Sequence, residues 1–299
     1  MTVRAWAELL RVSALFTVPG DALAGAAAVG RRPDRSTALA VGASLCLYEA
    51  GMALNDWADR EEDAVDRPHR PIPSGRITPR AALTAAGGLT AAGLALAARA
   101  GRPALGVATG LAATVWAYDL RLKHTPAGPA AMAAARGLDL LLGAVATGAG
   151  ARTAPTPGRA LTAAALLSAH TYAVTTVSRH ETQGGSTTAP LTALAAVAGI
   201  GGAVVRGRQT SRGAARPASA RLLLAAFSGA YLHTAARPLA HAALNPSPPL
   251  TQRAVGSGIR AMIPLQAALA SRAGATGTGL AVMGLVPLAR ALSRKVSPT

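Results

Sequence analysis

Residues 38–66 have the sequence ALAVGASLCLYEAGMALNDWADREEDAVD, in which an apolar run leads directly into a cluster of acidic residues. A helix that crosses a lipid bilayer needs about 20 largely apolar residues, and residues 38–57 meet that length. Similar apolar runs recur along the whole chain. The stretch therefore predicts a membrane-spanning helix whose polar end carries several carboxylates.

The composition extends this prediction to the rest of the chain. Of the 299 residues, 51% are hydrophobic and only 14% are charged, whereas a soluble protein of this length carries roughly 25% charged residues. We therefore expect an all-α fold, a polytopic transmembrane bundle of about nine helices. It should form one domain over residues 1–299 and lie in the cell membrane as an integral, multi-pass protein.

Nine segments are long and apolar enough to span a bilayer. A tenth, 254–271, is interrupted by Arg260 and Pro264, and could be a short span, an interfacial helix, or part of a longer final hairpin. The segments are rich in alanine and glycine, which let helix backbones approach closely in lipid, so we expect a compact bundle. The nine predicted spans are 12–30, 38–57, 82–99, 103–120, 129–149, 159–178, 187–205, 219–243 and 274–292.

The net charge of +17 raises the question of a nucleic-acid partner. The basic residues are spread through short connections between apolar segments, with few aromatic residues to stack on bases. We therefore expect the partners to be membrane lipids with anionic headgroups and an anionic substrate, and no nucleic acid. The polar connections 56–80, 121–128 and 179–186 follow alternate spans and so should share one side of the membrane, although both sides carry arginines and charge does not say which.

The acidic cluster at the end of the span 38–57 predicts a metal site. Six of the 13 acidic residues lie between positions 56 and 66. On a continuous helix Asn55, Asp59 and Asp63 would stack along one face, with Asp56 beside them. Like charges stacked in this way repel, and Mg²⁺, which is commonly held by one or two carboxylates together with substrate phosphates, would relieve the repulsion. The alternative is a solvated loop that simply ends the helix.

Basic residues follow directly in the segment 67–76, RPHRPIPSGR. The planar guanidinium of arginine suits phosphate oxygens, so Arg67 and Arg70 are candidates for binding a diphosphate. The prolines stiffen the segment and fix the direction of these side chains. The alternative for any one of these arginines is the positive charge that membrane proteins carry in cytosolic loops.

Together these residues resemble a known motif. The pattern Asn55-Asp56-x-x-Asp59-x-x-x-Asp63, followed by Asp66-Arg67-Pro68-x-Arg70-Pro71-Ile72-Pro73-Ser74-Gly75, is similar to the first aspartate-rich motif of the UbiA superfamily of intramembrane prenyltransferases. The resemblance implies a nine-helix bundle around a central cavity, and transfer of a prenyl group from an isoprenyl diphosphate to an aromatic or other lipophilic acceptor with Mg²⁺. It also implies cytosolic motif loops. The metal and diphosphate ligands would be Asn55, Asp56, Asp59 and Asp63, assisted by Arg67 and Arg70.

A second similarity follows the fourth predicted span, in Tyr118-Asp119-Leu120-Arg121-Leu122-Lys123. It resembles the family's Tyr-x-x-x-Lys element, which contacts diphosphate, but the spacing is one residue longer. Lys123 and Lys295 are the only lysines among 30 basic residues, and the compact ammonium of Lys123 suits a phosphate oxygen. Tyr118 and Arg121 are further candidates for binding substrate, although Tyr118 could instead anchor its helix at the membrane interface.

The chain departs from the family where a second aspartate-rich motif is usual. Residues 178–185 are SRHETQGG, so Ser178 and Gly185 stand where two acids are expected and Glu181 is the one carboxylate. Either a single metal suffices, or Arg179 and His180 neutralise the diphosphate instead, or the transfer chemistry has been lost. Glu181 is a candidate metal ligand, and Arg179 and His180 are candidate substrate-binding residues.

From these patterns Asp59, Asp63, Lys123 and Glu181 are the expected catalytic residues. Charged residues within the spans are costly and so mark the cavity by default, which makes Arg136 and Asp139 candidates for binding substrate unless they simply pair with each other. Glu181 and Asp139 are candidates for the base. The competing hypothesis is a non-catalytic membrane protein that binds or moves a lipid-linked or amphiphilic metabolite. By the same argument, Asp21, Glu49 and Arg237 inside the spans should also mark the cavity.

Overall fold

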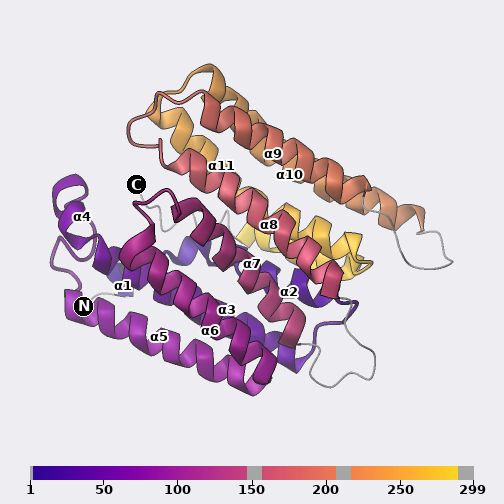
Figure 1. The fold of residues 1–299 in the computed structure, drawn as a ribbon, viewed down its shortest axis with the longest axis horizontal. Helices are drawn as coiled ribbons and strands as arrows, with labels where there is room; N and C mark the ends of the chain where they lie inside the picture. The colour runs from indigo at the N-terminus through magenta and orange to yellow at the C-terminus, as the bar shows by residue number, and fades with distance from the viewer. Residues whose placement is uncertain (1–2, 147–156, 207–216, 289–299) are drawn as a thin grey trace.

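The computed structural model describes residues 3–146, 157–206 and 217–288, apart from the side chains of residues 13 and 14. The last residues of two predicted spans, 147–149 and 289–292, lie outside these ranges. Every regular element in the described ranges is helical, and the helices form one elongated bundle (Figure 1). The predicted all-α class is therefore confirmed.

The described ranges contain twelve α-helices, one 3-10 helix and one π-helix. In chain order they are α1 (Val3–Leu9), η1 (Val12–Thr17), α2 (Pro19–Ala28), α3 (Arg35–Ala58), α4 (Arg60–Asp66), α5 (Pro79–Ala100), α6 (Arg102–Ala117), η2 (Tyr118–Leu122), α7 (Gly128–Ala146), α8 (Pro157–Ser178), α9 (Thr188–Arg206), α10 (Ala218–Leu244), α11 (Pro248–Arg272) and α12 (Thr276–Met283).

Each predicted span coincides with helix, and the first one is formed by η1 and α2 together. The count of nine was approximate, because the segment 254–271 is also a helix. It forms most of α11, which runs on through Pro264 and is followed directly by α12. Most of α11 after Arg260 is buried among the other helices. The segment is therefore part of a final hairpin, as one of the three alternatives predicted, and a central element of the bundle.

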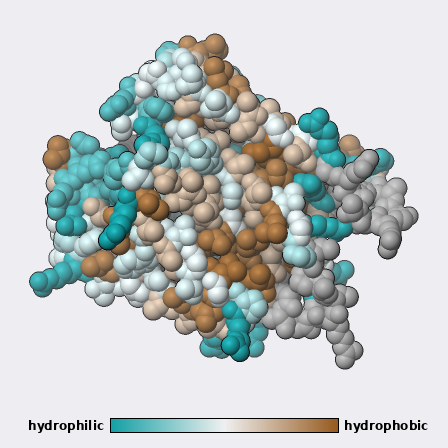
Figure 2. Space-filling model, viewed as in Figure 1, coloured by the Kyte–Doolittle hydropathy of each residue, from teal (hydrophilic) through white to brown (hydrophobic). Residues whose placement is uncertain are grey.

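The surface fits insertion in a membrane. Within the described ranges, five helices are by themselves long and apolar enough to cross a bilayer: α3, α5, α7, α8 and α9. Figure 2 shows hydrophobic residues across the middle of one face, with hydrophilic residues gathered toward the two ends. Large apolar side chains such as Leu161, Leu191 and Leu222 are more than half exposed, as expected where lipid covers them. The chain is an integral, multi-pass membrane protein.

Helices α2 and α7 pack backbone against backbone. A Cβ atom added to Gly143 on α7 would collide with the backbone of Ala22 on α2, and one added to Gly25 on α2 would collide with the backbone of Leu140. In lipid such close approach supplies the dispersion contacts that hold helices together. Glycine at these two positions is therefore what lets the two helix backbones approach so closely.

Replacing Gly143 with alanine should destabilise the protein by about 1–3 kcal/mol, because the methyl group forces α2 and α7 apart in a packed interior. The measurement is the unfolding midpoint of the purified protein in detergent. Gly106→Ala on α6 is the control, since a Cβ atom there meets nothing within 4 Å and alanine favours helix. Equal stability of the two variants would show that the α2–α7 contact is looser than described.

The three polar connections predicted to share one side of the membrane meet at one end of the bundle, where α3 passes into α4 (Figure 1, left). The backbone N–H of Gly185 donates to the Pro246 carbonyl at 2.8 Å, which joins the α8–α9 and α10–α11 connections. Arg179, after α8, donates to the backbone carbonyl of Thr125, between α6 and α7. We call this the motif end of the bundle.

Candidate active site

The acidic segment does not lie on one continuous helix. Helix α3 ends at Ala58, and Asp59 adopts φ −88° and ψ 4° before α4 begins at Arg60. The hydrogen bonds from Asp59 N to Asn55 O (2.9 Å) and from Asp63 N to Asp59 O (2.7 Å) persist through the break. The change of direction nevertheless separates the carboxylates, so the expectation that Asn55, Asp59 and Asp63 share one face is wrong.

The main cavity opens at the motif end and has a volume of about 1000 Å³. Its wall is apolar in the middle, where Leu47, Met52, Leu111, Val115 and Met132 contribute, and polar at both ends. Eight of the residues singled out from the sequence line it. They are Asn55, Asp56, Arg67, Arg70, Tyr118, Arg136, Asp139 and Glu181.

Asp56 and Asp63 are buried and are bridged by one arginine. The Arg70 guanidinium nitrogen Nη1 lies 3.2 Å from Asp56 Oδ1 and 2.8 Å from Asp63 Oδ2, and Arg67 lies 3.5 Å from Asp63 Oδ1. The side chains of the two aspartates are 5% and 3% exposed. These carboxylates therefore point into the protein and not into bulk water. A site that holds a metal ion against a diphosphate needs this arrangement.

The proline-containing segment after α4 holds these arginines in place. Ile72 and Ile77 are buried, and the Ile77 N–H donates to the Pro71 carbonyl at 2.9 Å, which closes the segment into a compact turn. The Ser74 N–H donates to the Arg70 carbonyl at 3.0 Å and fixes the backbone of that arginine. The direction of the Arg70 side chain is therefore set by the turn, as the prolines suggested.

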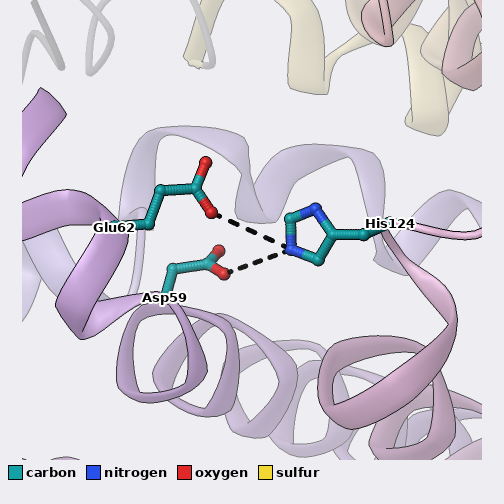
Figure 3. Close-up of side chains that lie close together, drawn as sticks. All are labelled: Asp59, Glu62 and His124. Atoms are coloured by element: carbon teal, nitrogen blue, oxygen red, sulfur yellow. Dashed lines mark ion pairs between the residues drawn. The ribbon is translucent and has the colours of Figure 1, made fainter.

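Asp59 lies outside the main cavity, in a smaller one of about 360 Å³ that Arg121, Lys123 and His124 also line. Its Oδ1 pairs with the Lys123 ammonium and lies 3.8 Å from His124 Nε2. Glu62 Oε2 lies 3.9 Å from the same nitrogen, and Figure 3 shows both carboxylates directed at the His124 ring. One ligand atom from each of Asp59, Glu62 and His124 falls within 4.8 Å of the others.

A π-helix explains the extra residue between Tyr118 and Lys123. The Lys123 N–H donates to the Tyr118 carbonyl at 3.0 Å, a hydrogen bond over five residues. Such a π-turn inserts one residue into an α-helix and is often found at functional sites. It places Tyr118 in the wall of the main cavity and Lys123 in the wall of the smaller one. The two cavities are adjacent, since Asp119 lines both.

Two of the residues that the sequence analysis did not single out contact the acidic motif directly. Asp119 is 4% exposed, and its Oδ1 accepts a hydrogen bond from Asn55 Nδ2 at 3.0 Å. An acid at the end of an apolar helix is an available signal for it. Arg11, which precedes η1, reaches Asp56 Oδ1 at 3.2 Å. Nothing distinguishes Arg11 in the sequence from an arginine that merely flanks the first span.

The segment after α8 contributes one carboxylate. Glu181 lines the main cavity, as does Ser178, whereas Arg179 and His180 line neither cavity. Burial raises the pKa of the Glu181 carboxyl above its ordinary value, and the charges of Arg67 and Arg11 oppose this rise. The structure therefore brings Glu181 to the motif residues and leaves Arg179 in contact with the Thr125 carbonyl.

A second charged cluster lies at the inner end of the main cavity. Arg136 pairs with Asp21 at 2.5 Å, not with Asp139, and Asp139 accepts a hydrogen bond from Ser44. Gln266 Nε2 also donates to Asp21, at 2.7 Å. Ser44 precedes Asp56 by twelve residues of α3, or about 18 Å along the helix. Asp21, Glu49 and Arg237 were also expected to mark the cavity, but they are not among its lining residues.

Known proteins share this architecture. At 18% identity, the structure of a UbiA homolog from Archaeoglobus fulgidus bound to GPP and Mg²⁺ superimposes with a TM-score of 0.64, over 94% of this chain and 99% of that chain. The apo structure of a UbiA homolog from Aeropyrum pernix K1, also 18% identical, gives 0.64 over 91% and 98%. These likenesses establish the fold.

Sequence comparison identifies the family. A digeranylgeranylglyceryl phosphate synthase of Halobacterium salinarum is 34% identical over 218 residues, 73% of this chain and 75% of that protein. The synthase of Methanopyrus kandleri is 39% identical over 129 residues, so the chain matches 46% of that relative's length. The sequence model of the UbiA prenyltransferase family matches residues 13–244. The chain belongs to the UbiA prenyltransferase family.

Proposed function

We propose that the protein is a membrane-embedded prenyltransferase that moves a prenyl group from an isoprenyl diphosphate to a lipophilic acceptor, with Mg²⁺ at the diphosphate. The observation that carries the proposal is the burial of Asp56 and Asp63 beside Arg67 and Arg70, of which Asp56 and both arginines line the polar end of the main cavity. Carboxylates held against guanidinium groups in this way suit a metal ion and a diphosphate bound together.

The donor set fits Mg²⁺, which prefers oxygen ligands. Asp56 and Asp63, which Arg70 bridges, would hold it at the main cavity with help from Glu181. Asp59 and Glu62 would offer ligands from the adjacent smaller cavity. When bound, Mg²⁺ acts as a Lewis acid and template that withdraws charge from the diphosphate. The arginine and lysine side chains at the motif end would accompany it by donating hydrogen bonds to the phosphate oxygens as negative charge develops there.

The reaction breaks the bond between the prenyl carbon and the diphosphate oxygen, and the electron pair leaves with the diphosphate. The apolar wall formed by Leu47, Leu111 and Val115 keeps water from the resulting allylic cation. A nucleophilic atom of the acceptor then bonds to the prenyl carbon and releases a proton. Glu181, at the same end of the cavity as the diphosphate, and Asp139, at the inner end, are the two candidate bases, since both line the cavity.

The position of the site gives the proposal a direction across the membrane. We assign the motif end to the cytosolic side of the cell membrane. An isoprenyl diphosphate carries a charged diphosphate on an apolar chain, and its diphosphate would enter the cavity from the water at that end. The acceptor is proposed as a lipophilic molecule, aromatic or not. The relatives named as digeranylgeranylglyceryl phosphate synthases make a non-aromatic acceptor the first to test.

The experiment is an assay of diphosphate release by the purified protein in detergent, with a panel of labelled isoprenyl diphosphates of increasing chain length and Mg²⁺. We expect release from at least one of them, its abolition by EDTA, and its recovery when Mg²⁺ is restored. Silence across the panel, with the compounds still bound, would overturn the proposal. It would instead favour a non-catalytic protein that binds or moves an amphiphilic metabolite, which the loss of acids at Ser178 and Gly185 otherwise supports.

A further inference from the structure

Arg11 occupies an unusual backbone position between α1 and η1. Its φ and ψ are both 48°, and it is the one non-glycine residue with positive φ in the described ranges. This left-handed conformation is unfavourable for residues with a Cβ atom, and where it persists the surroundings hold it in place. Here it directs the Arg11 side chain toward the end of α3, and Arg11 lines the main cavity.

The contacts of Arg11 are made by one nitrogen. Its Nη2 lies 3.2 Å from Asp56 Oδ1 and 3.5 Å from Asn55 Oδ1. No hydrogen bond from Arg11 Nε or Nη1 to another described residue is present, so part of the guanidinium fork is free to donate. A planar fork with free N–H groups, held at the polar end of a cavity, is suited to phosphate oxygens.

Two arginines, Arg11 and Arg70, contact Asp56 Oδ1, and they differ in their other partners. Arg70 Nη1 also lies 3.2 Å from this oxygen, but it has a second carboxylate partner, Asp63, at 2.8 Å. The other contact of Arg11 is to the neutral amide of Asn55 at the longer distance of 3.5 Å. A cation that binds Asp56 at Oδ1 would displace one of these guanidinium groups. Arg11 is the more weakly held of the two, because it has no second carboxylate partner.

We propose that Arg11 is a substrate-binding residue that exchanges partners: it neutralises Asp56 when the cavity holds no diphosphate, and it donates to the diphosphate when Mg²⁺ takes its place on Asp56. This inference rests on the proposed function. It assigns to Arg11 the role of the additional cation that the sequence suggested for Arg179 and His180, which line neither cavity.

The test measures binding of Mg²⁺ alone, and of inorganic pyrophosphate in the presence of Mg²⁺, to the full-length protein in detergent. The variants are Arg11→Gln and Arg11→Gly; glycine adopts positive φ without strain, so the second variant keeps the backbone conformation. We expect both to weaken pyrophosphate binding about 10- to 100-fold, as the loss of a charge-assisted hydrogen bond does. Both should bind Mg²⁺ alone at least as tightly as the wild type, because its competitor for Asp56 is gone.

Arg80→Gln is the matched control, since Arg80 is an exposed arginine at the start of α5 and lines neither cavity. It should leave both affinities unchanged. Weakening of Mg²⁺ and pyrophosphate binding together in the Arg11 variants would overturn the exchange and make Arg11 a purely structural support. Unchanged pyrophosphate binding would overturn it as well. Failure of the wild-type protein to bind pyrophosphate with Mg²⁺ would instead remove the proposed function itself.

Discussion

Diphosphate release should fall at least about 1000-fold when Asp59 is replaced by alanine. Asp59 lies where the chain turns from α3 into α4, with the Lys123 ammonium on its Oδ1 and with Glu62 and His124 nearby. Removing its carboxylate takes away a ligand proposed for Mg²⁺. It also leaves the ammonium of Lys123, whose side chain is almost buried, without its partner. A loss of several kcal/mol of transition-state stabilisation corresponds to a rate change of this size.

Asp66→Ala is the control for this loss. Asp66 belongs to the same acidic segment and has the same charge, but it is exposed at the end of α4 and lines neither cavity. Its removal should change the rate less than about 3-fold, because exposed charges interact weakly through water. Single-turnover measurement of diphosphate release separates the chemical step from product release. Equal rates for the two variants would mean that net negative charge, and not the position of Asp59, matters.

The second large effect concerns stability. Replacing Arg136 with leucine should destabilise the folded protein by about 3–5 kcal/mol, because it leaves the carboxylate of Asp21 buried without its cation. Asp21 is 0% exposed, and it accepts hydrogen bonds from Arg136 on α7 and from Gln266 on α11. The measurement is the free energy of unfolding of the purified protein in mixed micelles with increasing SDS.

Two further variants show whether the pair itself is responsible. Arg99→Leu replaces an exposed arginine near the end of α5 and should change stability by less than about 0.5 kcal/mol. The double variant Asp21→Asn, Arg136→Leu should recover most of the loss, since removing both charges of a buried pair costs far less than removing one. If the double variant is as unstable as Arg136→Leu, the lost packing of the arginine side chain, and not the unpaired carboxylate, accounts for the effect.

The helices and much of the site could be predicted because their signals are local. Twenty apolar residues in a row specify a spanning helix whatever surrounds them, and the spacing of Asp56, Asp63 and Arg70 within one segment already suggested that they act together. The structure adds that Arg70 bridges the two aspartates. Even the π-turn had a signal, the extra residue between Tyr118 and Lys123.

What the sequence did not predict depends on contacts between distant segments. Arg11 reaches Asp56 across 45 positions, and Asn55 reaches Asp119 across 64. The partner of Arg136 is Asp21, 115 positions away, and not Asp139, which is three residues along the same helix. The turn at Asp59 places that carboxylate in a different cavity from Asp56, and there it pairs with Lys123, 64 positions away.

The bridge that Arg70 makes between Asp56 and Asp63 has a consequence for selectivity inside the cell. Because its charges are already paired, the pocket binds a divalent ion alone or free phosphate alone more weakly than the two together, since either one alone would leave a buried partner of the opposite sign unpaired. A ligand that contains both positive and negative charge, such as a phosphoester with a bound metal ion, can pair with the aspartates and the arginines together. Such internal matching would protect the site from the abundant small ions of its surroundings.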